Sequence, residues 1–180
     1  MVNGPRTNLA VAVLTRVAAV TVASGMLGCG AAAAFDGRSY RAEGVSFHVG
    51  EAPASWQRST RVEGPLVAYE DPAHHGVVSV YARCGRDGDD VPLTALTQHL
   101  LIGFTEREIA KQEVEPFDGR EALHTVASGK LDGVAVGLDM FVLKKDGCVY
   151  DLVYAAPPAS IDGGMAGFES FARGFGSGSR

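Results

Sequence analysis

The most regular pattern in the chain lies in its second half, where apolar residues recur at every second position. This alternation runs over Val134, Val136, Leu138, Met140 and Val142. Three Asp-Gly pairs, at 118–119, 132–133 and 146–147, follow one another at intervals of 14 residues. Asp-Gly supplies the positive φ angles that two-residue hairpin turns require. The pattern therefore predicts a three-stranded antiparallel meander over residues 120–131, 134–145 and 148–156.

The register of this meander follows from its turns. A two-residue turn at 146–147 places Val142 opposite Asp151 and Met140 opposite Val153. The other face also carries large apolar residues, which are Phe141, Leu143, Tyr150, Leu152 and Tyr154. A sheet that is apolar on both faces needs cover on both sides. We therefore expect helices on the two faces.

Shorter strands are predicted before the meander, at residues 44–50, 66–70 and 77–84. Trp56 follows Pro53 in a loop and is expected to pack as an anchor of the core. Residues 109–114 are interpreted as a short edge strand that ends before Pro116.

Two stretches have the spacing of amphipathic helices. The first covers residues 92–104, where Asp90 is a suitable cap and Pro92 fits the first turn. Its apolar stripe consists of Leu93, Leu96, Leu100, Leu101 and Phe104. The second covers 163–174, and its apolar residues are Met165, Phe168, Phe171, Ala172 and Phe175. The predicted fold class is α+β, an antiparallel sheet with helices packed on its faces.

The N-terminus has the composition of an export signal. Arg6 and Arg16 are its only charged residues, and an apolar run of small residues follows over 17–28. Residues 26–29, Met-Leu-Gly-Cys, resemble a bacterial lipobox, although Met26 and Leu27 depart from the usual pattern. The resemblance implies cleavage after residue 28 and lipidation of Cys29. The alternative is a plain signal peptide that is cut near residues 31–34.

These features divide the chain into four parts. A lipoprotein signal peptide is predicted for 1–28 and a linker for 29–39. One α+β domain is predicted for 40–175, and a disordered tail for 176–180. Gly30, rather than aspartate, follows Cys29, which slightly favours the outer membrane over the inner one. A soluble periplasmic or secreted protein is the alternative location.

Two cysteines remain if Cys29 carries lipid. Cys84 ends one predicted strand and Cys148 begins another, and an even pair in an oxidising compartment favours a disulfide. Closing this loop of 64 residues would stabilise the fold by roughly 4 kcal/mol in the chain-entropy model. Two unpaired cysteines, one buried as a small apolar residue, are the alternative.

The charge balance argues against one broad class of partner. Of the 180 residues, 16 are basic and 21 acidic, which gives a net charge of −5. Nucleic-acid binding requires a surplus of positive charge, so no nucleic-acid partner is expected. Lys144 and Lys145, with Arg83 and Arg86, form a small basic group that we interpret as ordinary surface charge.

The chain has no recognisable catalytic or cofactor motif. His74-His75 and Asp71 lack a third ligand at a fixed spacing, and His48, His99 and His124 are scattered, so no metal site is predicted. No Gly-x-Ser-x-Gly, Walker A or dinucleotide-binding motif occurs, and no cofactor is expected. The acidic pair Asp89-Asp90 is assigned to helix capping, and the pair Glu113 and Glu115 to a solvent-facing strand.

The order of features over residues 40–175 resembles a known family. A strand–Trp–strand opening precedes a helix, then Asp118-Gly-Arg-Glu-Ala-Leu begins the meander. Tyr150-Asp-Leu-Val-Tyr-Ala-Ala-Pro and a last helix complete it. This order is similar to PsbP-like and DcrB-like α/β/α sandwich proteins, and to small bacterial lipoproteins. The resemblance implies a non-enzymatic accessory protein and brings no functional residue with it.

Two functional hypotheses from different classes remain. The first is a lipid-anchored interaction protein that docks onto a protein complex of the cell envelope, through an exposed apolar patch around Tyr69, Tyr81 and Phe117. The alternative is a carrier for a lipid or a small apolar ligand, which requires an enclosed apolar pocket. A third hypothesis, an enzyme, has no supporting set of residues, so no catalytic residue is assigned.

Overall fold

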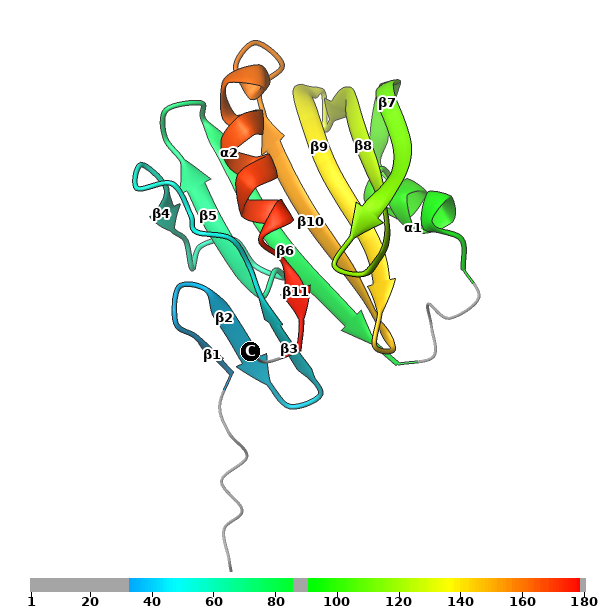
Figure 1. Cartoon of the computed structure of the whole chain (residues 1–180). Coiled ribbons are helices and arrows are strands. Elements are labelled where there is room, and N and C mark those ends of the chain that lie inside the picture. Colours follow the sequence, from blue (N-terminus) through cyan, green and yellow to red (C-terminus); the bar gives the residue numbers. More distant parts are fainter. Residues whose placement is uncertain (1–32, 86–90, 179–180) are drawn as a thin grey trace, which may run out of the picture.

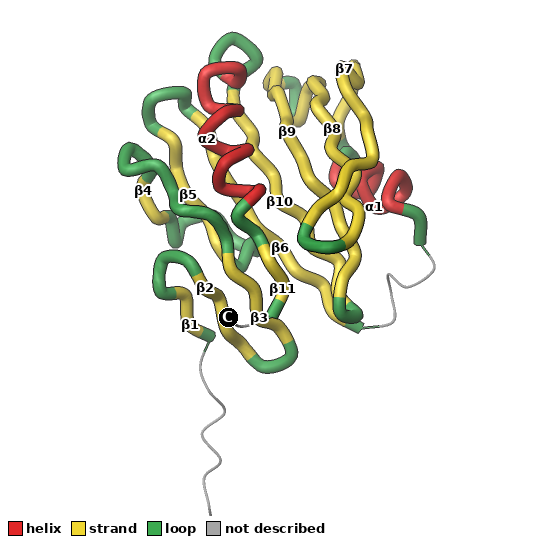
Figure 2. Tube along the Cα trace, viewed as in Figure 1, coloured by secondary structure: helices red, strands yellow, loops and turns green. Residues whose placement is uncertain are grey.

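A computed structural model describes residues 33–85 and 91–178, and these form two antiparallel sheets and two helices (Figures 1 and 2). The larger sheet has the order β4-β5-β6-β10-β9-β8-β7. Its strands are β4 (Gln57–Arg58), β5 (Val67–Asp71), β6 (Gly76–Cys84), β7 (Phe104–Phe117), β8 (Arg120–Leu131), β9 (Val134–Lys145) and β10 (Cys148–Ala156). The smaller sheet has the order β1-β2-β3-β11. Its strands are β1 (Ala34–Phe35), β2 (Ser39–Ala42), β3 (Val45–His48) and β11 (Gly176–Ser177).

The predicted meander is confirmed, including its register. Strands β8, β9 and β10 have the expected bounds, and Val142 lies opposite Asp151. The turn residues Asp132 and Asp146 have φ angles of 50° and 53°, and the glycines that follow them also have positive φ. These are the angles of two-residue hairpin turns, which match the twist of the strands they join.

The helices cover opposite faces of the larger sheet, as the two apolar faces require. Helix α2 (Ile161–Arg173) packs on β10, β9 and β6, and Figure 1 shows it in front of the sheet. Its Phe168 ring lies 5.8 Å from the rings of Phe141 and Tyr154. Helix α1 (Leu93–Leu100) packs on β8 and β9 from the other side, where Leu96 contacts Val142 and Val149. The predicted α+β class with helices on both faces is confirmed.

The segment between the first helix and the meander differs from the prediction. Helix α1 ends at Leu100 rather than at residue 104, because Gly103 adopts a φ of 88° and turns the chain. Phe104 then begins β7, which runs to Phe117 instead of covering only 109–114. Pro116 lies inside this strand and is tolerated because β7 is at the edge of the sheet, where one side of the backbone has no partner strand. The β7–β8 pairing is also interrupted by register shifts at 105/108 and 109/111.

The predicted linker 29–39 and tail 176–180 both contain strands. Within the described part of the linker, β1 forms and β2 begins at Ser39. Within the tail, β11 pairs with β3, because the end of α2 brings Gly176 beside His48. Cys29, the proposed cap Asp90 and residues 179–180 lie outside the described residues.

Helix α2 lies unusually close to the sheet near its first turn. It begins at Ile161, two residues before the predicted start at 163. A Cβ atom at Gly164 would collide with the hydroxyl group of Tyr154. Tyr154 is completely buried, and its hydroxyl donates a hydrogen bond of 3.0 Å to Asp71 Oδ2. The absence of a side chain at Gly164 therefore sets the distance between α2 and β10.

We expect Gly164→Ala to destabilise the protein by about 1–3 kcal/mol, although alanine normally favours a helix. The added methyl group forces Tyr154 or the helix to move. Urea denaturation measures the change in the free energy of unfolding. A double-mutant cycle with Tyr154→Phe supplies the control, since removing the hydroxyl should relieve part of the collision. A Gly164→Ala variant as stable as the parent would contradict this interpretation.

Candidate functional site

Two of the three residues predicted to form an interaction surface are buried. Tyr69 is 7% exposed and Phe117 is 5% exposed. The ring of Tyr69 lies 5.8 Å from that of Phe171 in α2, and the ring of Phe117 lies 5.2 Å from that of Phe141. Both residues are on the face that α2 and the smaller sheet cover, which strand alternation alone did not identify. Tyr81 is half-buried on the opposite face, so the predicted patch does not exist as one surface.

Exposed apolar residues gather elsewhere in the described part of the chain. They are Ile102, Ile109, Val114, Leu131 and Val134. Three of them form an apolar tip, which we define as Ile102, Leu131 and Val134. Leu131 pairs with Val134 across the β8–β9 turn, and Gly103 lies against its side chain. Val134 is 65% exposed and Ile102 72% exposed, so both present apolar surface to solvent at this end of the sheet.

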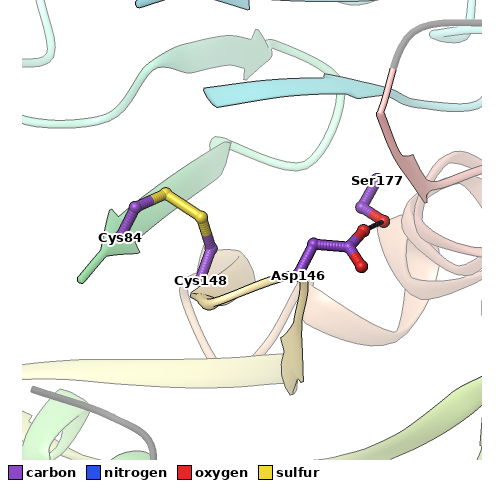
Figure 3. The surroundings of a disulfide bond; sticks show 4 residues. All are labelled: Cys84, Asp146, Cys148 and Ser177. Atoms are coloured by element: carbon purple, nitrogen blue, oxygen red, sulfur yellow. Dashed lines mark hydrogen bonds between the residues drawn. A yellow bond between two sulfur atoms is a disulfide. The ribbon is translucent and has the colours of Figure 1, made fainter. Parts of the chain in front are cut away.

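The opposite end of the larger sheet carries the predicted disulfide. Cys84 of β6 and Cys148 of β10 lie directly opposite each other and are bonded (Figure 3). Beside them, Gly85 N donates a hydrogen bond of 3.0 Å to Gly147 O. Figure 3 also shows Asp146, whose Oδ2 accepts a hydrogen bond of 2.6 Å from Ser177 Oγ. The turn after β9 is thus tied both to β6 and to the last strand of the chain.

A second carboxylate strengthens this junction, which we call the disulfide end. Asp118 Oδ2 accepts hydrogen bonds from Lys145 Nζ at 2.7 Å and from Ser177 N at 2.8 Å. Burial alone would raise the pKa of Asp118, but these two hydrogen bonds and the charge of Lys145 lower it below its ordinary value. The carboxylate therefore stays ionised and joins the β7–β8 turn to β9 and β11.

Surface hollows surround the disulfide end. One of about 130 Å³ is bordered by Arg120, Lys144, Lys145 and the 146–148 turn. A second of about 240 Å³ lies between the disulfide and α1, against Arg83, Leu96 and His99. A third of about 320 Å³ separates the turn from the smaller sheet. Pockets for drug-sized ligands measure about 300–1,000 Å³, so the first two hollows suit only small groups, and the third is at the lower end of this range.

A buried ion pair lies near the second hollow. Asp151 of β10 is fully buried, and Arg83 Nη1 lies 2.8 Å from its Oδ2. Burial raises the pKa of Asp151 to about 6, although the charge of Arg83 opposes the rise. The guanidinium group is half-exposed and so compensates this carboxylate only in part. The pair links β10 to β6 through one charged contact.

The histidine pair at 74–75 has a structural explanation. His74 Nδ1 lies 2.7 Å from Asp71 Oδ2, the oxygen that also accepts the Tyr154 hydroxyl. Burial, together with the hydrogen bond that the Tyr154 hydroxyl donates to Asp71, raises the pKa of Tyr154. His75 occupies an exposed turn position with a φ of 52°. Among residues 33–85 and 91–178, no group of three His, Cys, Asp or Glu side chains is placed to hold a metal ion.

A charged cluster that the sequence analysis missed joins β7, β8, β9 and α2. His124 Nε2 lies 2.7 Å from Asp139 Oδ1, and its Nδ1 lies 3.2 Å from Glu115 Oε1. Arg173 of α2 donates a hydrogen bond of 2.8 Å to Glu115. Burial alone would raise the pKa of Glu115, but Arg173 holds it below its usual range. Glu115 is therefore not the solvent-facing residue that was predicted, and the cluster fastens the edge strand to the helix.

The fold is that of known α/β/α proteins, as predicted. PsbP (CyanoP) from Synechocystis is 14% identical, with a TM-score of 0.54 over 76% of this chain and 88% of that chain. LpqN of Mycobacterium tuberculosis, which is involved in cell envelope biogenesis, is also 14% identical, with a TM-score of 0.54 over 76% and 86% of the two chains. A protein from Bacteroides thetaiotaomicron is 9% identical, with a TM-score of 0.50 over 74% and 46%.

These likenesses show the fold alone. No family model and no curated protein matches the chain. In the described residues, no helix has the length and apolar character needed to cross a membrane.

Reducing the Cys84–Cys148 bond is expected to lower the free energy of unfolding by up to about 4 kcal/mol, because the unfolded chain regains the entropy of a long loop. Urea denaturation with and without dithiothreitol measures the change. The double variant Cys84→Ser/Cys148→Ser is the control and should not respond to the reductant. An unchanged midpoint in the parent protein would contradict the prediction.

Asp151→Asn is expected to stabilise the protein at pH 7.5. Because the pKa of Asp151 is raised to about 6 from 3.8, the folded state loses stability as pH rises between these values. Asparagine avoids this loss, so the variant should gain about 3 kcal/mol at pH 7.5 and almost nothing at pH 4. Denaturation at both pH values measures the difference. A gain that does not depend on pH would exclude titration of Asp151 as its cause.

Proposed function

We propose that this protein is an exported, lipid-anchored and non-enzymatic interaction protein of the bacterial cell envelope, which docks onto a protein complex. Cys29 would carry the lipid, as the lipobox-like sequence indicates, and Gly30 favours the outer membrane. A disulfide is typical of exported proteins. The fold that this chain shares with LpqN, a protein of cell envelope biogenesis, agrees with the proposal.

The spacing between Cys29 and the first strand limits how far the anchored domain would lie from the membrane. β1 begins at Ala34, five residues after Cys29. Even fully extended, these residues span at most about 18 Å. A lipid on Cys29 would therefore hold the domain close to the membrane surface, with β1 nearest to it.

The apolar tip is the observation that carries the docking proposal. Ile102, Leu131 and Val134 expose apolar side chains that no other described element covers. In Figure 1, β1 lies at the bottom of the view, whereas the β8–β9 turn lies at the top. The tip would thus point away from the membrane that holds the anchor. A protein seated on that side could bury the tip without removing the anchor.

The packing of the core between α2 and the sheets favours a docking protein over a lipid carrier. A carrier requires an enclosed apolar pocket between helix and sheet. Aromatic rings of α2 and the two sheets occupy this space: Phe47, Phe141, Tyr150, Tyr154, Phe168 and Phe171, each at most 2% exposed. The hollows at the disulfide end lie outside this core and are bordered by charged residues.

The charged clusters support a non-enzymatic role. His74 and His124 are hydrogen-bonded to buried carboxylates, and Glu115 is bonded to Arg173. Each cluster joins elements of the fold through these hydrogen bonds. A stabilising role accounts for all three residues.

The proposal predicts that the triple variant Ile102→Ser/Leu131→Ser/Val134→Ser loses its partner but remains folded and anchored. Native mass spectrometry of protein extracted from its own membranes in mild detergent detects both the complex and the acyl mass on Cys29. The parent should retain a partner at fixed stoichiometry, and the variant should not, because burial of the tip supplies the binding energy.

Val114→Ser is the matched control, since Val114 is 57% exposed but lies outside the tip. It should retain the partner. Cys29→Ser should lose the acyl mass, which tests the anchor separately. Equal retention of the partner by the parent and the triple variant would reject the tip as the docking surface.

A further inference from the structure

Five Asp-Gly pairs lie within the described residues, and this dipeptide is chemically reactive. Because glycine has no side chain to shield its backbone nitrogen, this nitrogen is able to attack the carboxyl carbon of the aspartate that precedes it. The pairs are at 36–37, 118–119, 132–133, 146–147 and 162–163. A sixth pair, at 87–88, lies outside the described residues. The contacts of each aspartate decide which pair the fold leaves free to react.

Three of these pairs form the turns of the strands β7 to β10, and their backbones are nearly the same. The φ angles of Asp118, Asp132 and Asp146 are 47°, 50° and 53°. The glycines that follow have φ angles between 70° and 81°, and all three are exposed. Backbone conformation and exposure of the glycine therefore do not distinguish the three turns.

The contacts of the aspartate side chains do distinguish them. Asp118 Oδ2 accepts hydrogen bonds of 2.7 Å from Lys145 Nζ and 2.8 Å from Ser177 N. Asp146 Oδ2 accepts a hydrogen bond of 2.6 Å from Ser177 Oγ (Figure 3). Asp132 is exposed, and its carboxylate has no hydrogen bond or ion pair with any residue that the structure describes. Its side chain is therefore free to turn toward the glycine.

The other two described pairs are restrained in different ways. Asp36 Oδ1 accepts hydrogen bonds of 2.9 Å and 2.7 Å from two backbone N–H groups of the residues that follow it. Asp162 lies in the first turn of α2, where Gly163 N donates a hydrogen bond of 3.2 Å to Ser160 O. The nitrogen that would attack is therefore held by the helix.

We propose that Asp132-Gly133 is a site of spontaneous modification, at which aspartate is converted to isoaspartate through a cyclic imide. The Gly133 nitrogen forms a bond to Asp132 Cγ, and the amide proton and the carboxyl hydroxyl leave together as water. Water then adds to the backbone carbonyl carbon of Asp132, and the bond from this carbon to the Gly133 nitrogen breaks. The chain then runs through Cβ and Cγ, and the former backbone carbonyl group becomes a free carboxylate. Water is the only other reactant.

A carboxyl group that is held by hydrogen bonds reacts more slowly. These bonds must break before Cγ is able to approach the nitrogen of the glycine. Breaking one hydrogen bond to a charged group slows the reaction about tenfold. Asp118 and Asp146 are subject to this barrier, whereas Asp132 is not.

The conversion would change the turn that supports the apolar tip. It adds one carbon atom, about 1.5 Å of bond length, to the backbone of the turn. Leu131 and Val134 lie opposite each other because this turn has two residues at positive φ. With a longer backbone, the two side chains would no longer be held opposite each other. This consequence for docking rests on the proposed function, but the modification itself does not.

Peptide mapping of aged protein tests the site. The full chain is incubated at 37 °C and pH 7.5, then reduced, alkylated and digested with trypsin. Trypsin places the three turn aspartates on separate peptides, because it cleaves after Lys111, Arg120, Lys130 and Lys145. Electron-transfer fragmentation locates isoaspartate and gives its rate of formation at each position. The same incubation in urea with a reductant gives the rates in the unfolded chain.

Ser177→Ala is the matched variant. It removes the hydroxyl group that Asp146 accepts, but it keeps the backbone N–H that Asp118 accepts. It leaves the β8–β9 turn unchanged. Circular dichroism verifies that the variant is folded.

In the folded protein, we expect isoaspartate to form about tenfold faster at Asp132 than at Asp118 or Asp146. In urea the three rates should become similar, because the contacts that hold two of the carboxylates are lost. Ser177→Ala should accelerate the reaction at Asp146 about tenfold and leave the rate at Asp132 unchanged.

The proposal is overturned if Asp132 reacts no faster than Asp118 and Asp146 in the folded protein, or if its advantage persists in urea. It is also overturned if Ser177→Ala leaves the rate at Asp146 unchanged. None of these rates depends on a partner, so failure of the docking proposal would not alter them.

Discussion

The register of the β8–β9–β10 meander is the constraint on which the rest of this fold depends. The turns at 132–133 and 146–147 allow one pairing of the three strands, because each places an aspartate and a glycine at positive φ. A slip of one residue would move every side chain to the other face. The pairing decides that Phe141 lies beneath α2 and Val142 beneath α1. It also places Cys148 directly after the turn, where β10 pairs with β6 at Cys84.

The junction at the disulfide end depends on this same pairing. The β9–β10 turn presents Asp146 to Ser177, and Lys145 reaches Asp118 in the preceding turn. These contacts connect the last strand of the chain to the middle of the larger sheet. The smaller sheet is therefore held by aromatic packing between Phe47 of β3 and Tyr150, and by polar contacts at its edge strand β11.

Local sequence patterns predicted the meander from its Asp-Gly turns and the helices on both faces from the alternation of apolar residues. The disulfide was predicted from the even pair of cysteines at strand ends. These patterns did not predict that Tyr69 is buried, because alternation does not say which face of β5 receives α2. The length of β7 was underestimated because its many charged residues and Pro116 are typical of a loop. The His124–Asp139 pair was within reach of sequence reasoning, because the turn at 132–133 places His124 opposite Phe141, two residues from Asp139. Glu115 and Arg173 join this pair only through tertiary packing.

The irregular form of β7 affects the tendency of the protein to aggregate at high concentration. A long edge strand with open backbone groups is a template for adding further strands and for fibril growth. Here the two register shifts and Pro116 interrupt the row of groups that a second copy would need. The glutamates along the strand, such as Glu108 and Glu113, would repel an identical neighbour. At high concentration, copies of the protein would therefore remain separate molecules, even though each has a strand of fourteen residues at the edge of its sheet.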